Sequence, residues 1–269
     1  MLTMLTERLL VEGFAVPQFK DKLIDTLAIP TATRNLLQSL CRKFTSNATW
    51  SADFIESKGE GSIVLLHGKP GVGKTYTAGM RDKTETRWHV DADRKLECVA
   101  EEIKKPLISL TCADIGTNPE AVEESLTSWF KCATSWGAIL LLDEADVFLE
   151  RRSVTDLNRN NLVAIFLRSL EYYQGILLLT TNRIGTFDEA FLSRIDVPIY
   201  FGPLDNDQRV KIWGTFFSKL ERERQGKIRV SQDVRYYVKE DRDLLKLKWN
   251  GREIRSGLSR FHEVGASCS

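Results

Sequence analysis

Residues 62–75 read SIVLLHGKPGVGKT, an apolar run followed by a glycine-rich loop and a lysine–threonine pair. From Gly68 to Thr75 the stretch matches the pattern GxxxxGK[ST]. Glycines in this pattern let backbone N–H groups curl around phosphate oxygens, and the helix that follows adds a favourable dipole. Lys74 is expected to reach the β- and γ-phosphates, and the Thr75 hydroxyl to ligate Mg²⁺. The stretch therefore predicts a phosphate-binding loop between a buried strand and a helix.

Five short apolar runs predict the strands of one sheet. None alternates apolar with polar residues, as expected where helices cover both faces of a parallel sheet. The runs span residues 63–66, 107–110, 139–142, 176–179 and 198–201. Helical patterns lie between them over 119–136 and 158–173, and Thr117 or Asn118 is expected to cap the first. This alternation predicts a three-layer α/β/α domain with a parallel sheet.

Only helical patterns follow the last apolar run. Residues 205–224 carry apolar side chains at helical spacing, and 241–262 adds further helical segments. Another helix is expected at 31–44, after Pro30. We therefore predict three parts: an N-terminal helical segment (1–48), an α/β domain (49–203) and a small helical lid domain (204–269).

A second motif places two carboxylates at the end of an apolar run, ILLLDE at residues 139–144. Asp143 is expected to hold magnesium through water, and Glu144 to polarise the attacking water as a general base. Such a sequence is often only a strand followed by a solvated turn. Downstream of a phosphate loop, however, it indicates hydrolysis of a nucleotide.

With these motifs the chain resembles the AAA branch of the AAA+ ATPases, which are P-loop NTPases. The resemblance covers about residues 50–262 and also rests on LLLDEADVFLERR (140–152), TTNRIGTFDEAFLSRID (180–196) and NGREIR (250–255), in the family's order and spacing. Within this branch, the chain most resembles a group of fungal AAA-domain proteins whose cellular tasks are mostly undefined. The resemblance implies ATP and Mg²⁺ as cofactors, ATP hydrolysis, and a ring of identical subunits, expected to be a hexamer, that remodels a protein partner.

The resemblance also assigns roles to single residues. Asn182 matches the sensor asparagine that orients the attacking water, and Arg194 matches an arginine finger that reaches a neighbouring subunit's nucleotide. Arg252 matches a lid arginine that contacts the γ-phosphate. Glu144, Asn182 and Arg194 are thus the expected catalytic residues, and Thr75 and Asp143 the expected magnesium positions. The expected nucleotide-binding positions are Gly68, Lys69, Pro70, Gly71, Val72, Gly73, Lys74, Thr75, Tyr76, Asp143 and Arg252. A turn asparagine, a salt-bridge arginine and a solvated helix residue are the plainer interpretations of Asn182, Arg194 and Arg252.

Two departures from the family pattern bear on function, and the first of them, together with the interrupted helix described below, keeps a second interpretation open. Ser193 stands where the first of two finger arginines is expected, and residues 111–126 lack the aromatic pore loop of peptide-threading members. The alternative is a nucleotide-binding scaffold or switch with weak or no turnover. A clamp-loader function on DNA is a third possibility, because SRID (193–196) echoes the serine-arginine-cysteine motif of clamp loaders.

The run 79–96, GMRDKTETRWHVDADRKL, interrupts the helix that should follow the phosphate loop. Joining Ala78 to Glu97 gives KTYTAECVAEEIKKPL, which is a continuous helical pattern. The run is interpreted either as a solvated loop inserted in a helix, which costs little beyond closure entropy, or as a translated, unspliced intron. In both cases little of the first helix remains beside the phosphates, and so short a helix is marginal alone.

Composition sets broader limits. The formal net charge is +1, which gives no reason to expect nucleic acid or an acidic membrane as partner. Five widely spaced cysteines without a CxxC pair favour a reducing, intracellular compartment over a disulfide framework or a zinc site. The cytoplasm is the first choice, and an organelle or the nucleus is the alternative. No signal peptide or membrane anchor is predicted.

Overall fold

A computed structural model describes residues 29–45, 61–71, 94–116, 118–151, 156–183, 187–223 and 229–266. The predicted phosphate-binding residues 72–76 lie outside the described residues, as does most of the run 79–96.

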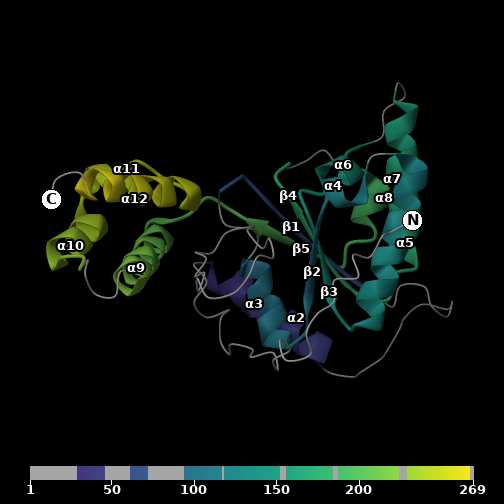
Figure 1. Ribbon diagram of the computed structural model, residues 1–269, viewed down its shortest axis with the longest axis horizontal. Coiled ribbons are helices and arrows are strands. Elements are labelled where there is room, and N and C mark those ends of the chain that lie inside the picture. Colours follow the sequence, from purple (N-terminus) through teal and green to yellow (C-terminus); the bar gives the residue numbers. More distant parts are fainter. Residues whose placement is uncertain are drawn as a thin grey trace.

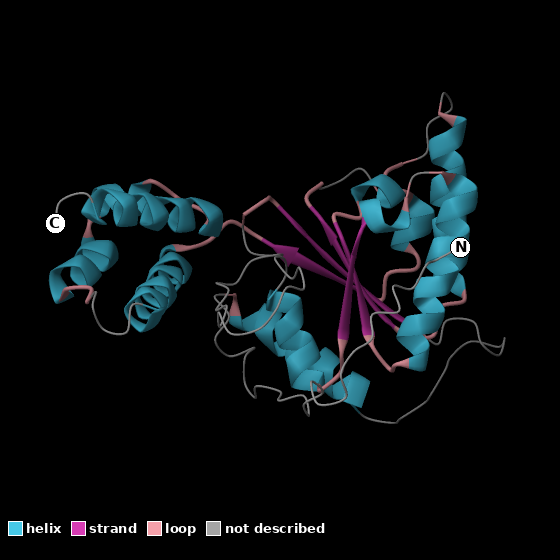
Figure 2. Cartoon of the chain, in the orientation of Figure 1, coloured by secondary structure: helices cyan, strands magenta, loops and turns pink. Residues whose placement is uncertain are grey.

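The centre of the fold is a five-stranded sheet in the order β2-β3-β4-β1-β5 (Figures 1 and 2). All neighbouring strands are parallel. The strands are β1 (Ser62–Gly68), β2 (Leu107–Thr111), β3 (Ile139–Asp143), β4 (Ile176–Thr181) and β5 (Val197–Phe201). Each coincides with one of the five apolar runs, so the predicted parallel sheet is confirmed.

Helices surround the sheet and follow it in the chain. They are α2 (Thr31–Thr45), α3 (Arg94–Ile103), α4 (Cys112–Ile115), α5 (Pro119–Ser135), α6 (Asp146–Leu149), α7 (Leu157–Glu171), α8 (Glu189–Leu192), α9 (Asn206–Glu223), α10 (Gln232–Glu240), α11 (Arg242–Lys246) and α12 (Gly251–Ala266). The helices expected at 31–44, 119–136, 158–173 and 205–224 are found with ends shifted by one or two residues. The side chain of Asn118 caps α5 by accepting a hydrogen bond from the Glu120 N–H at 3.3 Å.

Two apolar cores, one on each face of the sheet, make the three layers. Alternate residues of β1 enter different cores: Ile63 and Leu65 join the core under α5 and α7, and Val64 and Leu66 join the core under α2 and α3. Figure 1 shows these two helix pairs on opposite sides of the strands. Burial on both faces explains why the strands read as continuous apolar runs.

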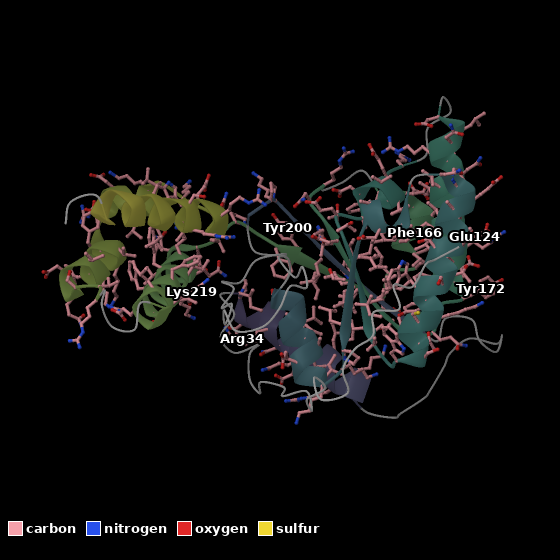
Figure 3. The ribbon with its side chains drawn as sticks, in the orientation of Figure 1. Arg34, Glu124, Phe166, Tyr172, Tyr200 and Lys219 are labelled. Carbon is pink, nitrogen blue, oxygen red and sulfur yellow. The ribbon has the colours of Figure 1, made fainter. Side chains whose placement is uncertain are left out.

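Helix α7 illustrates how the outer layer is fixed. Phe166 is fully buried and stacks on Phe148 with 5.0 Å between ring centroids. In Figure 3 Phe166 lies inside the domain, whereas Glu124 and Tyr172 point outward from α5 and the end of α7. An apolar stripe on α7 thus faces the sheet and leaves polar groups on the surface.

Helices α9 to α12 form a separate small bundle beside the sheet (Figure 1). Its core consists of Trp213, Phe216, Phe217, Val238 and Ile254. Helix α10 was not predicted, because only Val238 of its residues is buried and Tyr236 and Tyr237 are exposed. Within the described helices, none has both the length and the apolar character needed to cross a bilayer.

Helix α3 corrects one predicted boundary. The sequence suggested that the helix resumes at Glu97, after an insert ending at Leu96, but α3 begins at Arg94. The last residues of the run 79–96 are therefore helical. The sequence does hold a start signal that was overlooked, because Asp93, a residue type favoured at helix N-caps, stands directly before Arg94.

Candidate active site

The sheet register brings the predicted catalytic motifs to one edge. His67 pairs with Thr181 across β1 and β4, and Leu142 pairs with Leu179 across β3 and β4. The carboxyl ends of these three adjacent strands are therefore level. With about 4.8 Å between neighbouring strands, the ends of β1 and β3 lie about 10 Å apart. That spacing suits the phosphates of a nucleotide and a cation between them.

Asp143 ends β3 and is held by the neighbouring strand. Its side chain is buried, and one oxygen, Oδ1, accepts hydrogen bonds from the Thr180 hydroxyl and from the Glu144 N–H at 3.0 Å. Thr180 is itself 1% exposed. In the described part of the chain no hydrogen bond reaches the second oxygen, Oδ2. A fixed carboxylate with one uncommitted oxygen fits the preference of Mg²⁺ for hard oxygen ligands, directly or through water.

Glu144 leaves the strand in a left-handed backbone conformation, with φ of 52°. This is uncommon for a residue other than glycine and needs support from its surroundings. Three contacts supply it: the Glu144 N–H donates to Thr180 Oγ1 at 3.0 Å as well as to Asp143, and the Glu144 carbonyl accepts from the Cys112 thiol at 3.1 Å. The left-handed turn leaves the residue exposed at the sheet edge, where a general base must meet water.

Cys112 is suited to this supporting role because it stays protonated. Burial raises the pKa of its thiol to about 11, and the negative charge of Asp146 adds to the effect. At neutral pH the S–H group is present and can donate to the Glu144 carbonyl.

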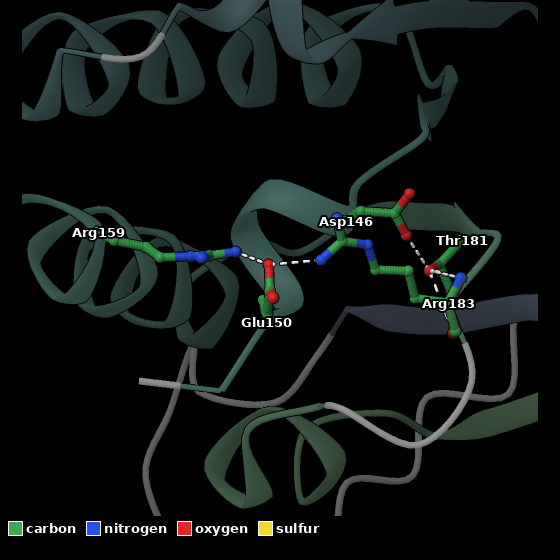
Figure 4. A network of polar contacts seen from close by, with 5 residues as sticks. All are labelled: Asp146, Glu150, Arg159, Thr181 and Arg183. Carbon is green, nitrogen blue, oxygen red and sulfur yellow. Dashed lines mark hydrogen bonds and ion pairs between the residues drawn. The ribbon is translucent and has the colours of Figure 1, made fainter. Parts of the chain in front are cut away.

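Asn182 follows β4 directly and is half-buried. The Thr181 hydroxyl before it donates to Asp146, and the Arg183 N–H after it donates back to Thr181 Oγ1 at 3.1 Å (Figure 4). Arg183 also forms an ion pair with Glu150. The structure thus places Asn182 at the same edge as Glu144. Of its two neighbours, Thr181 is held by Asp146 of α6, and Arg183 is held by Glu150, which directly follows α6.

The first residues of the predicted phosphate loop need glycine at two positions. A side chain at Gly68 would meet the Phe201 carbonyl oxygen at 2.2 Å. Gly71 has φ of 76°, and a side chain there would meet Asn250 Cγ at 2.7 Å. Lys69 and Pro70 between them are exposed. The loop backbone therefore approaches both β5 and the lid more closely than a larger residue allows.

The lid reaches this loop through the start of α12. The Gly251 N–H donates to the Gly71 carbonyl at 2.9 Å. Asn250 caps α12 by accepting from the N–H groups of Arg252 and Glu253, each at 3.0 Å. Arg252 is exposed and directly follows the residue bound to the loop. The structure thus brings this predicted lid arginine to the phosphate-loop side of the lid.

Among the predicted site residues that the structure describes, Arg194 is the one that does not lie at this edge. Its guanidinium forms an ion pair with Glu171, at the end of α7 that precedes β4, and donates to the Ala190 carbonyl at 2.6 Å. Two residues later, the Asp196 N–H donates to the Ile63 carbonyl near the start of β1. Arg194 therefore lies toward the amino edge of the sheet and cannot serve the site of its own chain.

Several residues at the site were not singled out from the sequence. Thr180 and Cys112 hold Asp143 and Glu144, and Asn250 fits against Gly71. A signal for Thr180 did exist: a hydroxyl that ends a fully apolar run, ILLLT, needs a polar partner inside the sheet. Asn250 also had a signal, because an asparagine followed three residues later by Glu253 is a helix N-cap pattern. Cys112 offered no comparable local signal.

Comparison with known families agrees with this arrangement. Residues 96–203 match the model described as ATPase family associated with various cellular activities (AAA), and residues 204–264 match the fungal AAA+ ATPase lid domain. The chain belongs to the AAA ATPase family. It is a nucleotide-binding AAA module with the α/β P-loop NTPase fold and a lid, as the sequence predicted. The lid match also agrees with the predicted likeness to fungal AAA-domain proteins.

Curated relatives of this AAA module are longer proteins. The chain is 25% identical over 201 residues to ATPase family AAA domain-containing protein 3B of Homo sapiens, which covers 71% of this chain and 28% of that protein. It is 27% identical over 206 residues to ATPase family AAA domain-containing protein 3 of Xenopus tropicalis, covering 74% of this chain and 32% of that protein. The chain thus spans about a third of the length of these relatives.

Solved structures show the same fold. The crystal structure of the FIGL-1 AAA domain in complex with ADP superposes with a TM-score of 0.59 at 17% identity, covering 88% of this chain and 72% of that chain. Another structure of the FIGL-1 AAA domain gives a TM-score of 0.53 at 17% identity and covers 74% of this chain and 62% of that chain. At this level of identity the likeness concerns the fold.

Proposed function

We propose that this AAA module binds ATP with Mg²⁺ and hydrolyses it. The observation that carries the proposal is the level edge of β1, β4 and β3, where the start of the phosphate loop, the sensor position Asn182 and the pair Asp143–Glu144 meet. A scaffold that only holds a nucleotide has no need for a carboxylate that is exposed and turned out of its strand. That FIGL-1 was solved with ADP supports adenine nucleotides as the ligand class.

Each group has a definite task in this proposal. Residues 68–76 bind the phosphates, with Lys74 as the charged contact and Thr75 and Asp143 as the magnesium positions. The cation, when bound, neutralises charge that develops on the phosphates. Glu144 takes the proton of the attacking water, and Asn182 orients that water. Arg252 approaches the γ-phosphate from the lid.

The second half of the proposal is that the active form is an oligomer. Arg194 lies away from its own chain's site, as a residue that acts on a neighbouring subunit's nucleotide must. Its side chain is one-quarter exposed, and Glu171 holds it in place. We propose a ring, hexameric by family analogy, with the nucleotide between the α/β domain (49–203) and the lid (204–269). The near-neutral net charge favours a protein partner over nucleic acid.

Turnover of Mg·ATP, measured by phosphate release, tests the proposal. We expect Glu144→Gln to lower the rate by about 10²–10⁴-fold, since it removes the general base, and to leave ATP binding intact. Arg194→Ala should lower the rate without changing binding by the isolated chain. Arg151→Ala is the matched control, because Arg151 likewise pairs with a glutamate, Glu189 of α8, but is well exposed. A rate in the native chain no higher than that of Glu144→Gln would rule out hydrolysis.

One observation favours a second candidate, a nucleotide-binding module with weak turnover. The match to the AAA family begins at residue 96, after the phosphate loop and almost all of the run 79–96. Since α3 begins at Arg94, a deletion that tests this run should remove 79–93 only. If the shortened chain alone turns over ATP, the run impairs an otherwise intact enzyme. If both forms are equally active, the run is a tolerated loop.

A further inference from the structure

We propose that Glu150 is a positioning residue for Asn182, acting through Arg183. The inference rests on the proposed hydrolysis and adds a residue that neither the motifs nor the family comparison singles out. Glu150 comes directly after α6, the helix that follows the catalytic carboxylates. It therefore joins the end of one catalytic motif to the sensor position of the next strand.

The contacts of Glu150 converge on one carboxylate oxygen. Its Oε2 pairs with Arg183 Nη1 at 2.8 Å and with Arg159 Nη2 from α7. Figure 4 shows the three side chains in a row, with Glu150 between the two arginines. Arg159 thus neutralises and orients the carboxylate, and the carboxylate in turn holds Arg183, the residue directly after Asn182.

The other neighbour of Asn182 is held from the same helix. The Thr181 hydroxyl donates to Asp146, in the first turn of α6 (Figure 4). Asn182 therefore lies between two anchored residues. Thr181 is held by the first turn of α6, and Arg183 is held by Glu150, directly after α6. Any displacement of α6 moves Glu144 and Asn182 together.

The backbone beyond the sensor is fixed at the same place. Glu150 forms an isolated antiparallel bridge with Phe187, and the Asp188 N–H donates to the Leu149 carbonyl at 3.1 Å. Residues 149–150 therefore contact the chain both at Arg183 and again at Phe187 and Asp188. Glu150 is the point at which side-chain and backbone anchoring of this segment meet.

The ion pair is better suited to placing the sensor than to stabilising the fold. Arg183 is 56% exposed and Glu150 is 23% exposed. Pairs that are this open to water contribute little to global stability because solvent screens them and ordering long side chains costs entropy. A hydrolytic water, in contrast, must be oriented closely, and small misplacements of an orienting group cost rate.

The test is Glu150→Gln, which keeps the shape of the side chain and removes its charge. We expect the rate constant at saturating Mg·ATP to fall about tenfold, with the Michaelis constant and the melting temperature close to those of the native chain. Glu123→Gln is the matched control, because it removes an exposed ion pair to another arginine of α7, Arg168. That control should leave all three quantities unchanged.

A second readout does not require turnover. Amide hydrogen exchange of the peptide around residues 176–183 should be faster in Glu150→Gln than in the native chain, and unchanged in Glu123→Gln. Arg183→Gln should reproduce both effects, and the double variant Glu150→Gln with Arg183→Gln should be no worse than either single change, since both remove one contact.

A rate constant and an amide hydrogen exchange in Glu150→Gln equal to those of the native chain would overturn the inference. Fully additive losses of rate in the double variant would also overturn it. A lower melting temperature that accounts for the whole loss of rate would also overturn it. If the native chain itself shows no turnover above Glu144→Gln, the proposed hydrolysis fails, and unchanged hydrogen exchange would then separately remove the role of Glu150.

Discussion

The two halves of the candidate site are built in different ways. At the β3–β4 edge, Asp143, Glu144 and Asn182 are fixed by contacts within one domain, through Thr180, Thr181 and Cys112. At the phosphate loop, the described residues instead touch the lid, through one backbone hydrogen bond from Gly251 and the close fit of Asn250 against Gly71. Under the proposed function, this difference means that the residues of hydrolysis are held in place within one domain, whereas phosphate binding depends on where the lid sits. Changes at the first region should lower turnover, and changes at the second should lower affinity.

The largest effect is expected from Thr180→Val, which breaks the β3–β4 edge. Valine keeps the shape but leaves the buried Asp143 carboxylate and the Glu144 N–H without the hydroxyl, which costs about 1–3 kcal/mol of unfolding free energy. Turnover should fall more than ATP affinity does. Urea unfolding and steady-state kinetics measure the two effects.

Thr215→Val controls for the loss of a threonine hydroxyl, since Thr215 only donates to the Lys211 carbonyl on the surface of α9. An equal loss of affinity and turnover in Thr180→Val would contradict the division into two regions.

Gly71→Ala is expected to break the contact between loop and lid. An alanine at a φ of 76° costs about 1–2 kcal/mol, and its methyl group would also overlap Asn250. The lid must then move away, and ATP affinity should fall roughly tenfold while turnover at saturation changes less. Isothermal titration with ATP and Mg²⁺ measures this.

Gly137→Ala is the matched control, because Gly137 has φ of 58° and no atom within 4 Å of the added methyl group. If both alanine variants lose affinity equally, backbone strain alone is responsible and the lid contact is not.

A smaller effect is expected from Asn250→Ala, which sharpens the same comparison. Loss of the α12 cap costs about 0.5–2 kcal/mol, and ATP affinity should fall with it. Because alanine also removes the atoms that crowd position 71, the double variant with Gly71→Ala should lose less than the two single losses combined.

Ser231→Ala removes a comparable cap from α10, where Val234 N–H donates to the serine at 3.4 Å. It should lower the stability of the lid without the coupling to position 71. Additive losses in the double variant would show that Asn250 acts only as a cap.

The smallest effect concerns pH. The folded chain keeps protons on Cys112 and Cys41, whose pKa values burial raises to about 11 and about 12 from an ordinary 9.0. The unfolded chain releases these protons above about pH 9, so it binds fewer protons, and stability falls as pH rises through this window. Below about pH 9 the folded and unfolded chains both keep these protons, so the two thiols do not lower the free energy of unfolding. In urea unfolding from pH 8 to 11, Cys112→Ala should show a shallower decline than the native chain, and an equally steep decline would argue against the raised pKa.

Much of the sheet could be predicted from the sequence, because strands buried on both faces read as unbroken apolar runs. The pairing of Asp143 with Glu144 after such a run, and the loop glycines, were equally readable from local pattern. The partners of Thr180, Cys112 and Glu150 were not, since they depend on which elements become neighbours. The apolar run before Thr180 indicated only that its hydroxyl needs a polar partner. The beginning of α3 at Arg94 also escaped, although Asp93, a residue type favoured at helix N-caps, stands directly before it in the sequence.

The position of β1 in the sheet has a consequence for biosynthesis. β1 lies between β4 and β5, and Ser62 pairs with Ile176, more than one hundred residues later in the chain. At about 5–20 residues per second of translation, the apolar segment 62–68 waits roughly 5–25 s on the ribosome for its first partner strand. Through that interval it is an unpaired β-prone segment of the kind that associates with other chains. The interior strand that leads into the predicted phosphate loop is thus also where a holdase chaperone has the longest opportunity to bind.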